Sequence, residues 1–197
     1  MASTTKGSPR GSRKERREEE RADRIEALRQ LALGQIRRYP DPVLRERARE
    51  VDEFSDDLRA LVGRMGRVME DAHGVGLAAT QLGLLRRILV FRANEEDELG
   101  VLINPVIVEH SEETTNEGEG CLSLPEVHVP VERFATIVVE GVDADGDDVR
   151  VEAEGLQSRV IQHEIDHLDG VLIFDRTTPE ARREAMRALR PRPDERG

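Results

Sequence analysis

The sequence predicts an α+β fold, with small antiparallel and mixed β-sheets around a central helix and further helices at the N-terminus and the C-terminus. β-branched and apolar segments gather within residues 87–153, whereas apolar residues with helical periodicity occur before and after them. Asp145 and Gly146 form the Asp-Gly pair that is typical of a tight hairpin. Residues 162–168 carry two histidines one helical turn apart, and they mark the central helix.

The composition indicates one ordinary domain with an aliphatic core. The chain has 197 residues, which is enough to bury a sizeable core. Hydrophobic residues make up 37% of the chain but aromatic residues only 3%, so Leu, Ile, Val and Ala must build most of that core. The formal net charge of -11 argues against binding to duplex DNA over the whole surface, and we expect no sequence-specific DNA partner.

The single cysteine and the hydropathy of the chain indicate where in the cell the protein is located. Cys121 has no second cysteine with which to form an intramolecular disulfide, and this suits a reducing cytosol. No run of residues is long and apolar enough to span a bilayer, and the N-terminus lacks the apolar core of a secretory signal. We therefore expect a cytoplasmic protein with no membrane partner.

The first 35 residues are predicted to form an N-terminal extension. Residues 1–17 are mainly Gly, Ser, Thr, Lys, Arg and Glu with almost nothing to bury, which predicts a disordered tail. Residues 18–33 predict a helix, because four apolar residues fall on one side: Ile25, Leu28, Leu31 and Ala32.

Two capped helices are predicted next. Asp41 precedes Pro42, a typical N-cap followed by proline in the first turn, and predicts a short helix that reaches Ala48. Ser55 is predicted to cap a longer helix. The core stripe of that helix consists of Leu58, Leu61, Val62, Met65, Val68, Met69 and Ala72.

The middle of the chain predicts strands. Residues 109–119 are acidic and predict a turn, whereas residues 143–147 predict a hairpin turn. The predicted strands are residues 87–91, 101–108, 121–124, 128–131, 135–142 and 149–153.

The last third of the chain predicts the central helix, a strand and a final helix. Gly155 opens the central helix, on which Leu156, Val160, Ile165 and Leu168 supply burial, and Gly170 ends it. Residues 171–174 predict a short strand. Residues 179–189 predict a basic amphipathic helix, followed by a frayed tail past residue 191.

The central helix has the spacing of a metal-binding helix. His163 and His167 lie on one face, so both imidazoles can bind one metal ion. Glu164 beside them can move protons to and from a metal-bound water. The alternative is an ordinary solvated helix that happens to carry two histidines and two acids.

A third ligand is needed, because catalytic sites usually have three protein ligands and one open position. Cys121 follows a glycine and offers a soft thiolate that suits Zn²⁺ or Fe²⁺. A Glu ligand remains open, and so does a plain buried cysteine in a strand. Residues 73–83, rich in small side chains, predict either a tight turn or a substrate-facing wall that ends in the Gln81 amide.

Three segments in this order give the site a family resemblance. They are Gly74-Val75-Gly76-Leu77-Ala78-Ala79-Thr80-Gln81, Glu119-Gly120-Cys121-Leu122-Ser123 and Gln162-His163-Glu164-Ile165-Asp166-His167-Leu168. Together with residues 40–45, Asn104-Pro105 and residues 170–176, they make residues 36–176 resemble the peptide deformylase family. We expect this range to be a catalytic metallohydrolase domain, with residues 177–197 as a basic C-terminal helix and tail. Glu126 and Ser158 depart from the family, where glycine and alanine are frequent.

The resemblance implies a role for each matching residue. It implies Cys121, His163 and His167 as metal ligands and Glu164 as the general acid and base. It implies the Gln81 side-chain amide and the Leu122 backbone N–H as oxyanion donors. The residues that it implies for binding of the substrate backbone and first side chain are Val75, Gly76, Leu156 and Val160.

The resemblance also implies the reaction. A metal-dependent amidohydrolase of this family removes the formyl group from the N-terminal methionine of nascent polypeptides by a metal-bound water and releases formate. The implied cofactor is one divalent ion, Fe²⁺ first, with Zn²⁺, Ni²⁺ or Co²⁺ as replacements. The implied partners are N-formyl-methionyl nascent peptides and, through the basic C-terminal helix, the ribosome.

Alternatives remain at the level of sequence. A peptidase can use the same His-Glu-x-x-His helix, and a non-catalytic module can dock on the ribosome. The helix at residues 179–189 can instead pack on its own domain. We also expect Arg133 to pair with Glu119 and hold the loop before Cys121.

Overall fold

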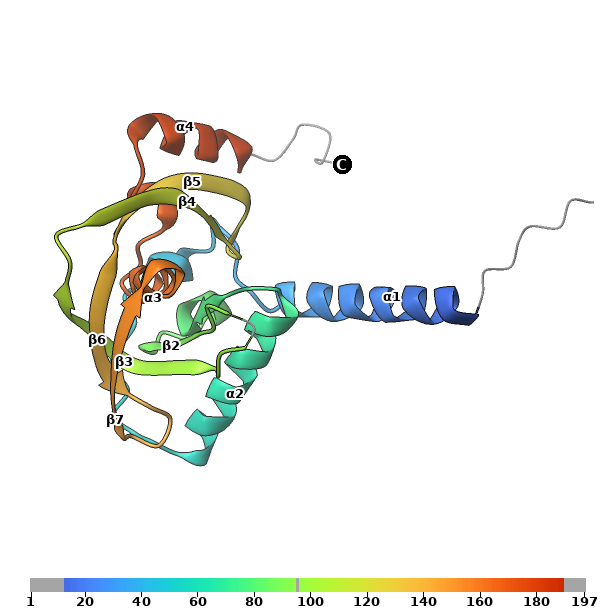
Figure 1. The fold of residues 1–197 in the computed structure, drawn as a ribbon, viewed down its shortest axis with the longest axis horizontal. Helices are drawn as coiled ribbons and strands as arrows, with labels where there is room; N and C mark the ends of the chain where they lie inside the picture. The colour runs from blue at the N-terminus through green and yellow to red at the C-terminus, as the bar shows by residue number, and fades with distance from the viewer. Residues whose placement is uncertain (1–12, 95, 190–197) are drawn as a thin grey trace, which may run out of the picture.

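The computed structural model describes residues 13–94 and 96–189 and has an α+β fold, which confirms the predicted class (Figure 1). Within these ranges no helix has both the length and the hydropathy to cross a membrane. The helices are α1 (Arg13–Leu33), α2 (Asp56–Asp71), α3 (Gly155–Leu168) and α4 (Pro179–Ala188), with 3-10 helices η1 (Pro42–Arg45), η2 (Ala79–Leu82) and η3 (Ile173–Asp175). The strands are β1 (Gly76–Ala78), β2 (Ile88–Phe91), β3 (Gly100–His110), β4 (Thr114–Cys121), β5 (Leu124–Phe134), β6 (Thr136–Val142) and β7 (Asp148–Glu154).

The strands form two antiparallel sheets. One sheet has the order β1-β2-β3-β6-β7, and the other is the ribbon β4-β5. Every pairing between the named strands is antiparallel, so the mixed character that we predicted is limited to an isolated parallel bridge between Arg49 and Arg86.

Helix α3 lies between the two sheets, as Figure 1 shows, and contacts β1, β2, β5 and β7. Ile161 and Leu168 are fully buried, and Val160 is nearly so. Leu156 differs from the prediction, because it is 51% exposed instead of buried. The helix is thus held on several sides, while its first turn stays accessible.

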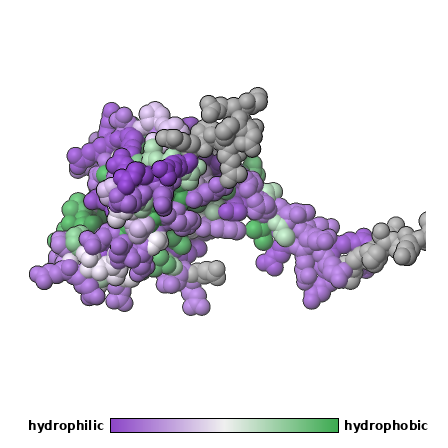
Figure 2. Space-filling model, turned by 90° about the horizontal axis from the view of Figure 1, so that it is seen from above, coloured by the Kyte–Doolittle hydropathy of each residue, from purple (hydrophilic) through white to green (hydrophobic). Residues whose placement is uncertain are grey.

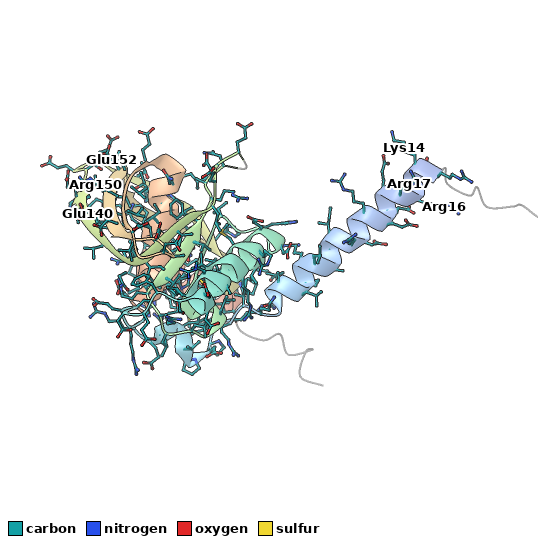
Figure 3. All side chains as sticks on the ribbon, turned by 90° about the horizontal axis from the view of Figure 1, so that it is seen from below. Lys14, Arg16, Arg17, Glu140, Arg150 and Glu152 are labelled. Atoms are coloured by element: carbon teal, nitrogen blue, oxygen red, sulfur yellow. The ribbon has the colours of Figure 1, made fainter. Side chains whose placement is uncertain are left out.

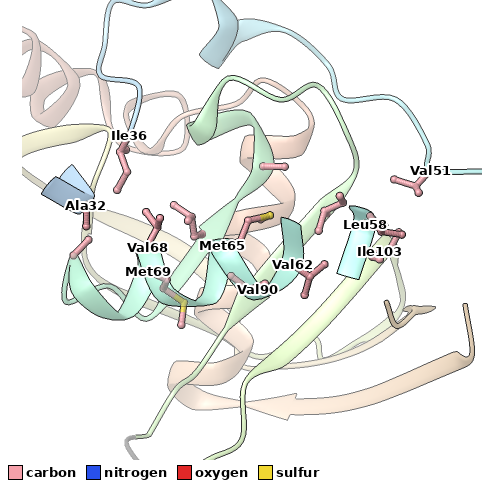
Figure 4. Packing of buried hydrophobic residues seen from close by; sticks show 14 residues of the cluster. Ala32, Ile36, Val51, Leu58, Val62, Met65, Val68, Met69, Val90 and Ile103 are labelled. Atoms are coloured by element: carbon pink, nitrogen blue, oxygen red, sulfur yellow. The ribbon is translucent and has the colours of Figure 1, made fainter. Parts of the chain in front are cut away.

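Helix α2 supplies one side of the core. The Ser55 side chain accepts a hydrogen bond from the Leu58 backbone N–H, which confirms the predicted cap. The predicted stripe is buried except for Leu61, which is partly buried, and it packs against β2 and β3 through Val90 and Ile103 (Figure 4).

Helix α1 begins at Arg13, five residues before the predicted start. Residues 13–20 are Arg, Lys and Glu, which favour helix, and Lys14 pairs with Glu18 one turn later at 3.8 Å. Lys14, Arg16 and Arg17 lie at the end remote from the body (Figure 3), whereas hydrophobic side chains gather where α1 meets it (Figure 2). The rest of the predicted disordered tail, residues 1–12, and the predicted C-terminal tail lie outside the described residues.

Two predictions in the strand region were wrong. Residues 114–121 form a strand, although residues 109–119 were predicted to be an acidic turn, because β4 pairs with β5 along its whole length. Of its two acidic residues, Glu117 is exposed and Glu119 is buried. Residues 121–124 do not form a strand of their own, because Cys121 ends β4, residues 122 and 123 form the turn, and Leu124 begins β5. The strand predicted at residues 128–131 is confirmed as part of the longer β5.

Two short elements also differ from the predictions. The helix expected to reach Ala48 is only the turn η1, although the Asp41 cap is present. The segment expected as a strand at residues 171–174 instead runs into the 3-10 helix η3, which begins at Ile173, because the Asp175 carboxylate accepts a hydrogen bond from the Leu172 N–H and closes the turn. Helix α4 packs on β5 and buries Ala185.

We predict that Gly170→Ala destabilises the fold more than Gly155→Ala. Both glycines have a positive φ, so a side chain at either costs about 1–2 kcal/mol. At Gly170 the added Cβ also meets the Arg45 carbonyl oxygen at 2.5 Å, whereas nothing lies within 4 Å at Gly155. Urea unfolding of the two variants measures the difference, and equal losses of unfolding free energy would contradict the role of the Arg45 backbone.

Candidate metal and active site

Three ligand-type side chains meet at the end of β4 and on one face of α3. The Cys121 sulfur lies 3.1 Å from Nε2 of His167, and the rings of His163 and His167 are 5.0 Å apart between centroids. One ligand atom from each of the three residues lies within 4.8 Å of the other two. The structure therefore brings together the three residues that the sequence predicted as ligands.

The donor set fits a single metal ion. Thiolate and imidazole ligands sit about 2.0–2.3 Å from an ion such as Zn²⁺, so ligands of one ion lie within about 4.5 Å of each other. The observed separations are close to that range. His167 is buried, and its Nδ1 has no hydrogen-bond partner among the described residues. Burial lowers the pKa of His167 well below its ordinary value, which keeps the ring in the neutral form that binds metals.

Glu119 orients His163. The His163 Nδ1–H donates a hydrogen bond of 3.0 Å to Glu119 Oε2, which leaves Nε2 free for a ligand bond. Burial opposes ionisation of Glu119, but hydrogen bonds from His163 and Arg133 outweigh it and lower the pKa of Glu119 to about 2. Glu119 is therefore a fixed anion behind the ring.

Arginines surround the Glu119 carboxylate. The predicted pair with Arg133 is confirmed, since Arg133 Nε and Nη2 donate to the two carboxylate oxygens at 2.9 and 3.0 Å. Arg133 also bonds Asp166, which in turn accepts from Arg176 near the surface. The sequence interpretation missed Arg159, which bonds Glu119 as well. Its spacing was a usable signal, because Arg159 lies one helical turn before His163 on the same face.

Glu164 has a different environment from Glu119. Its side chain is buried, and its Oε2 has no hydrogen-bond partner among the described residues. Burial raises the pKa of Glu164 to about 7. Strand β1 passes close by, and a Cβ on Gly76 would collide with the Glu164 carboxylate. A carboxyl group of this kind can exchange a proton near neutral pH.

The Gln81 amide is fixed with its nitrogen toward the cysteine. Its Oε1 accepts a hydrogen bond from the Ala78 N–H at 2.8 Å. Its Nε2 donates to Ser123 Oγ at 3.3 Å and lies 3.8 Å from the Cys121 sulfur. The acceptor end of the amide is therefore occupied, and the donor end faces the site.

One cavity of about 390 Å³ joins these groups. It is lined by all the predicted site residues except His167, which lies buried behind them. The exposed Val75 and Leu156 offer apolar surface at this cavity. Lining residues that the sequence interpretation did not assign are His73, Gly74, Gly118, Glu119, Gly120, His128 and Arg159.

The two departures from the family have local explanations. Glu126 has a φ of 64°, a conformation that glycine adopts most easily, which accounts for the frequent glycine there. Ser158 is fully buried, and its hydroxyl donates to the Phe134 carbonyl and accepts from Gln162. Its extra polar atom is therefore satisfied.

Comparisons with known proteins agree with this site. A family model described as polypeptide deformylase matches residues 33–183. Peptide deformylase 1 of Corynebacterium efficiens is 45% identical over 162 residues, which cover 81% of this chain and 96% of that relative. The peptide deformylase of Rhizobium meliloti is 48% identical over 139 residues, which cover 69% of this chain and 80% of that relative.

Solved structures show the same likeness. The crystal structure of peptide deformylase from Thermotoga maritima matches with a TM-score of 0.70 and 44% identity, covering 73% of this chain and 97% of that chain. A Plasmodium falciparum peptide deformylase matches with a TM-score of 0.74 and 37% identity, covering 78% and 92%. These matches set aside the peptidase and the non-catalytic module. The chain belongs to the peptide deformylase family, and it is a metal-dependent hydrolase that removes the formyl group from nascent peptides.

Proposed function

We propose that Cys121, His163 and His167 bind one divalent metal ion and that Glu164 is the general acid and base of deformylation. The observation that carries the proposal is the convergence of the three ligand atoms within 4.8 Å, in a site whose cavity Glu164 also lines. We further propose the Gln81 amide and the Leu122 backbone N–H as donors to the formyl oxygen.

We propose Fe²⁺ as the ion, with Zn²⁺, Ni²⁺ or Co²⁺ as replacements. One thiolate and two imidazoles form a mixed soft and borderline donor set that suits these ions. Three protein ligands leave the open position that a catalytic site keeps for water or substrate. When bound, such an ion lowers the pKa of water toward neutrality and polarises a carbonyl group.

Glu164 transfers the proton in this proposal. It takes a proton from the water that attacks the formyl carbon and gives it to the nitrogen of the leaving amine. As negative charge develops on the formyl oxygen, Gln81 Nε2 and the Leu122 N–H donate hydrogen bonds to it. A donor of this kind typically contributes about 2.7–4 kcal/mol to transition-state stabilisation. The products are formate and a free amine.

We propose that Val75, Gly76, Leu156 and Val160 bind the substrate backbone and its first side chain, methionine. The exposed Val75 and Leu156 offer apolar surface to a methionine side chain. A side chain on Gly76 would meet Val160 Cγ1 at 2.7 Å, so only glycine leaves this space open. A formyl carbon bears only hydrogen, and a narrow site can admit it while excluding bulkier acyl groups.

We also propose that residues 36–176 form the catalytic unit and that the protein is cytoplasmic.

We further propose a contact between the outer face of α4 and the ribosome. The inner face of α4 packs on β5, which supports the alternative of a helix that serves its own domain. Arg183 and Arg187 are exposed, however, and can face a partner while the inner face stays packed. Phosphate-rich RNA is the chemistry that such a basic face suits.

We predict that Glu164→Ala and Glu164→Gln keep the metal but lose about 10²–10⁴-fold in turnover of a formyl-methionyl peptide, because proton transfer is lost. Formate release measures turnover, and metal analysis of the same preparation measures occupancy. Near-normal turnover by the glutamine variant, which keeps the shape of the side chain, would remove Glu164 from its proposed role.

We predict that Cys121→Ser loses both metal affinity and activity, because a serine hydroxyl is a harder ligand and stays protonated. The loss of affinity should exceed the about 10–100-fold that removal of an outer partner costs. Dialysis against a chelator followed by metal analysis measures it. Full occupancy after dialysis would show that Cys121 is not a ligand.

We predict that Arg183→Glu combined with Arg187→Glu weakens cosedimentation with ribosomes and that raising the salt concentration weakens the unaltered chain in the same way. Arg64→Glu with Arg67→Glu is the control, since it reverses the same charge at two exposed positions of another helix, α2. Equal cosedimentation of both double variants with the unaltered chain would reject the α4 contact.

A further inference from the structure

Arg159 is a buried arginine at the boundary between α3 and the ribbon β4-β5. It is 6% exposed, although arginine is rarely buried without partners. Its Nη1 donates to Glu119 Oε1 at 2.8 Å and to the Val131 carbonyl at 2.9 Å. Its Nη2 donates to the Thr115 carbonyl at 3.1 Å and to the Thr115 hydroxyl at 2.8 Å. One guanidinium thus joins α3 to both strands of the ribbon.

These contacts leave Arg159 little capacity to bind substrate, although it lines the cavity. A guanidinium has five N–H groups, and the two Nη atoms already make four hydrogen bonds within the protein. The remaining Nε lies 3.6 Å from a carboxylate oxygen of Glu117. Its partners therefore indicate a role in holding other groups in place.

The group that Arg159 holds is the carboxylate behind His163. Glu119 Oε1 accepts from Arg133 Nε and from Arg159 Nη1, while Oε2 accepts from Arg133 Nη2 and from His163 Nδ1. Arg133 is shared, because its Nη1 bonds Asp166 at 2.6 Å. Arg159 therefore supplies a second positive charge to Glu119, from the side of α3.

We propose that Arg159 is a positioning residue that fixes Glu119 against His163 and thereby sets the ring orientation and donor strength of His163 Nε2 toward the metal. The inference rests on the proposed ligand set. Removal of Arg159 leaves Glu119 Oε1 with the hydrogen bond from Arg133 alone. It also removes the hydrogen bonds that connect α3 to Thr115 on β4. Arg133 alone then balances and holds the carboxylate, so the direction and strength of its hydrogen bond to His163 change.

The test uses Co²⁺ as the probe, since its visible absorption reports the geometry and strength of its ligands. We expect Arg159→Met to raise the Co²⁺ dissociation rate by about 10–100-fold, the usual effect of losing an outer-sphere partner, and to shift the absorption bands. Arg150→Met is the matched control: Arg150 pairs with Glu109 and Glu140 on the exposed sheet (Figure 3). Thr115→Val removes one Arg159 contact but keeps the bond to Glu119. Both controls should match the unaltered chain.

An unchanged Co²⁺ spectrum and dissociation rate in folded Arg159→Met would overturn the proposal. If that variant does not fold, Arg159→Gln, which has no charge and a shorter donor, is judged by the same two measurements.

The variant His163→Ala separates this inference from the proposed function. Unaltered Co²⁺ binding by His163→Ala would refute the ligand set itself, whereas loss of binding there with no effect at Arg159 would refute only the positioning role.

Discussion

The Glu119 carboxylate joins the two strands of the ribbon β4-β5 to the distant helix α3. It lies on β4 two residues before Cys121, and it accepts hydrogen bonds from Arg133 on β5 and from Arg159 and His163 on α3. A buried carboxylate without partners would be strongly unfavourable, so loss of one of these donors would cost folding free energy. This one anion therefore connects the end of β4, where Cys121 lies, to His163 on α3.

Two neighbouring carboxylates illustrate how environment assigns chemistry. Glu119 and Glu164 are both buried, yet hydrogen bonds and arginines lower the pKa of Glu119, whereas burial alone dominates at Glu164 and raises it. The first can hold a proposed ligand in place because it stays charged. The second can exchange a proton because it titrates near neutrality. The fold produces this contrast because Arg133 and Arg159 donate hydrogen bonds to Glu119 and donate none to Glu164.

The network of ion pairs around α3 serves to hold side chains in position more than to stabilise the fold. Replacing a buried ion pair with apolar residues is often neutral or stabilising, so such a network is weak support for stability in itself. Arg133 and Arg159 face Glu119 and Asp166, so these buried charges balance. What the network supplies is direction, because the Arg133 fork contacts both oxygens of Glu119 and Arg159 adds a further hydrogen bond to one of them. A metal site needs that direction more than it needs additional burial.

The sequence by itself determined the elements whose signals are local. The spacing of His163 and His167, the Ser55 cap and the Asp-Gly hairpin each depend on neighbours within one turn, and the structure confirms them. It also carried the three ordered segments from which the family could be inferred. The periodicity of α3 predicted burial for Leu156, but periodicity cannot show that the cavity leaves this first turn uncovered.

Only the tertiary structure revealed the remaining contacts between distant residues, beyond the predicted ligand set and the Arg133–Glu119 pair. The acidic segment before Cys121 looked like a turn, because its pairing with β5 depends on partners along another strand. The sequence interpretation assigned no role to Arg159, since its partners Thr115, Glu119 and Val131 come from the two strands of the ribbon. The helix or strand propensity of a segment does not depend on such contacts, so it cannot predict them. They form only when the ribbon folds over α3, and that packing decides which buried charges are balanced.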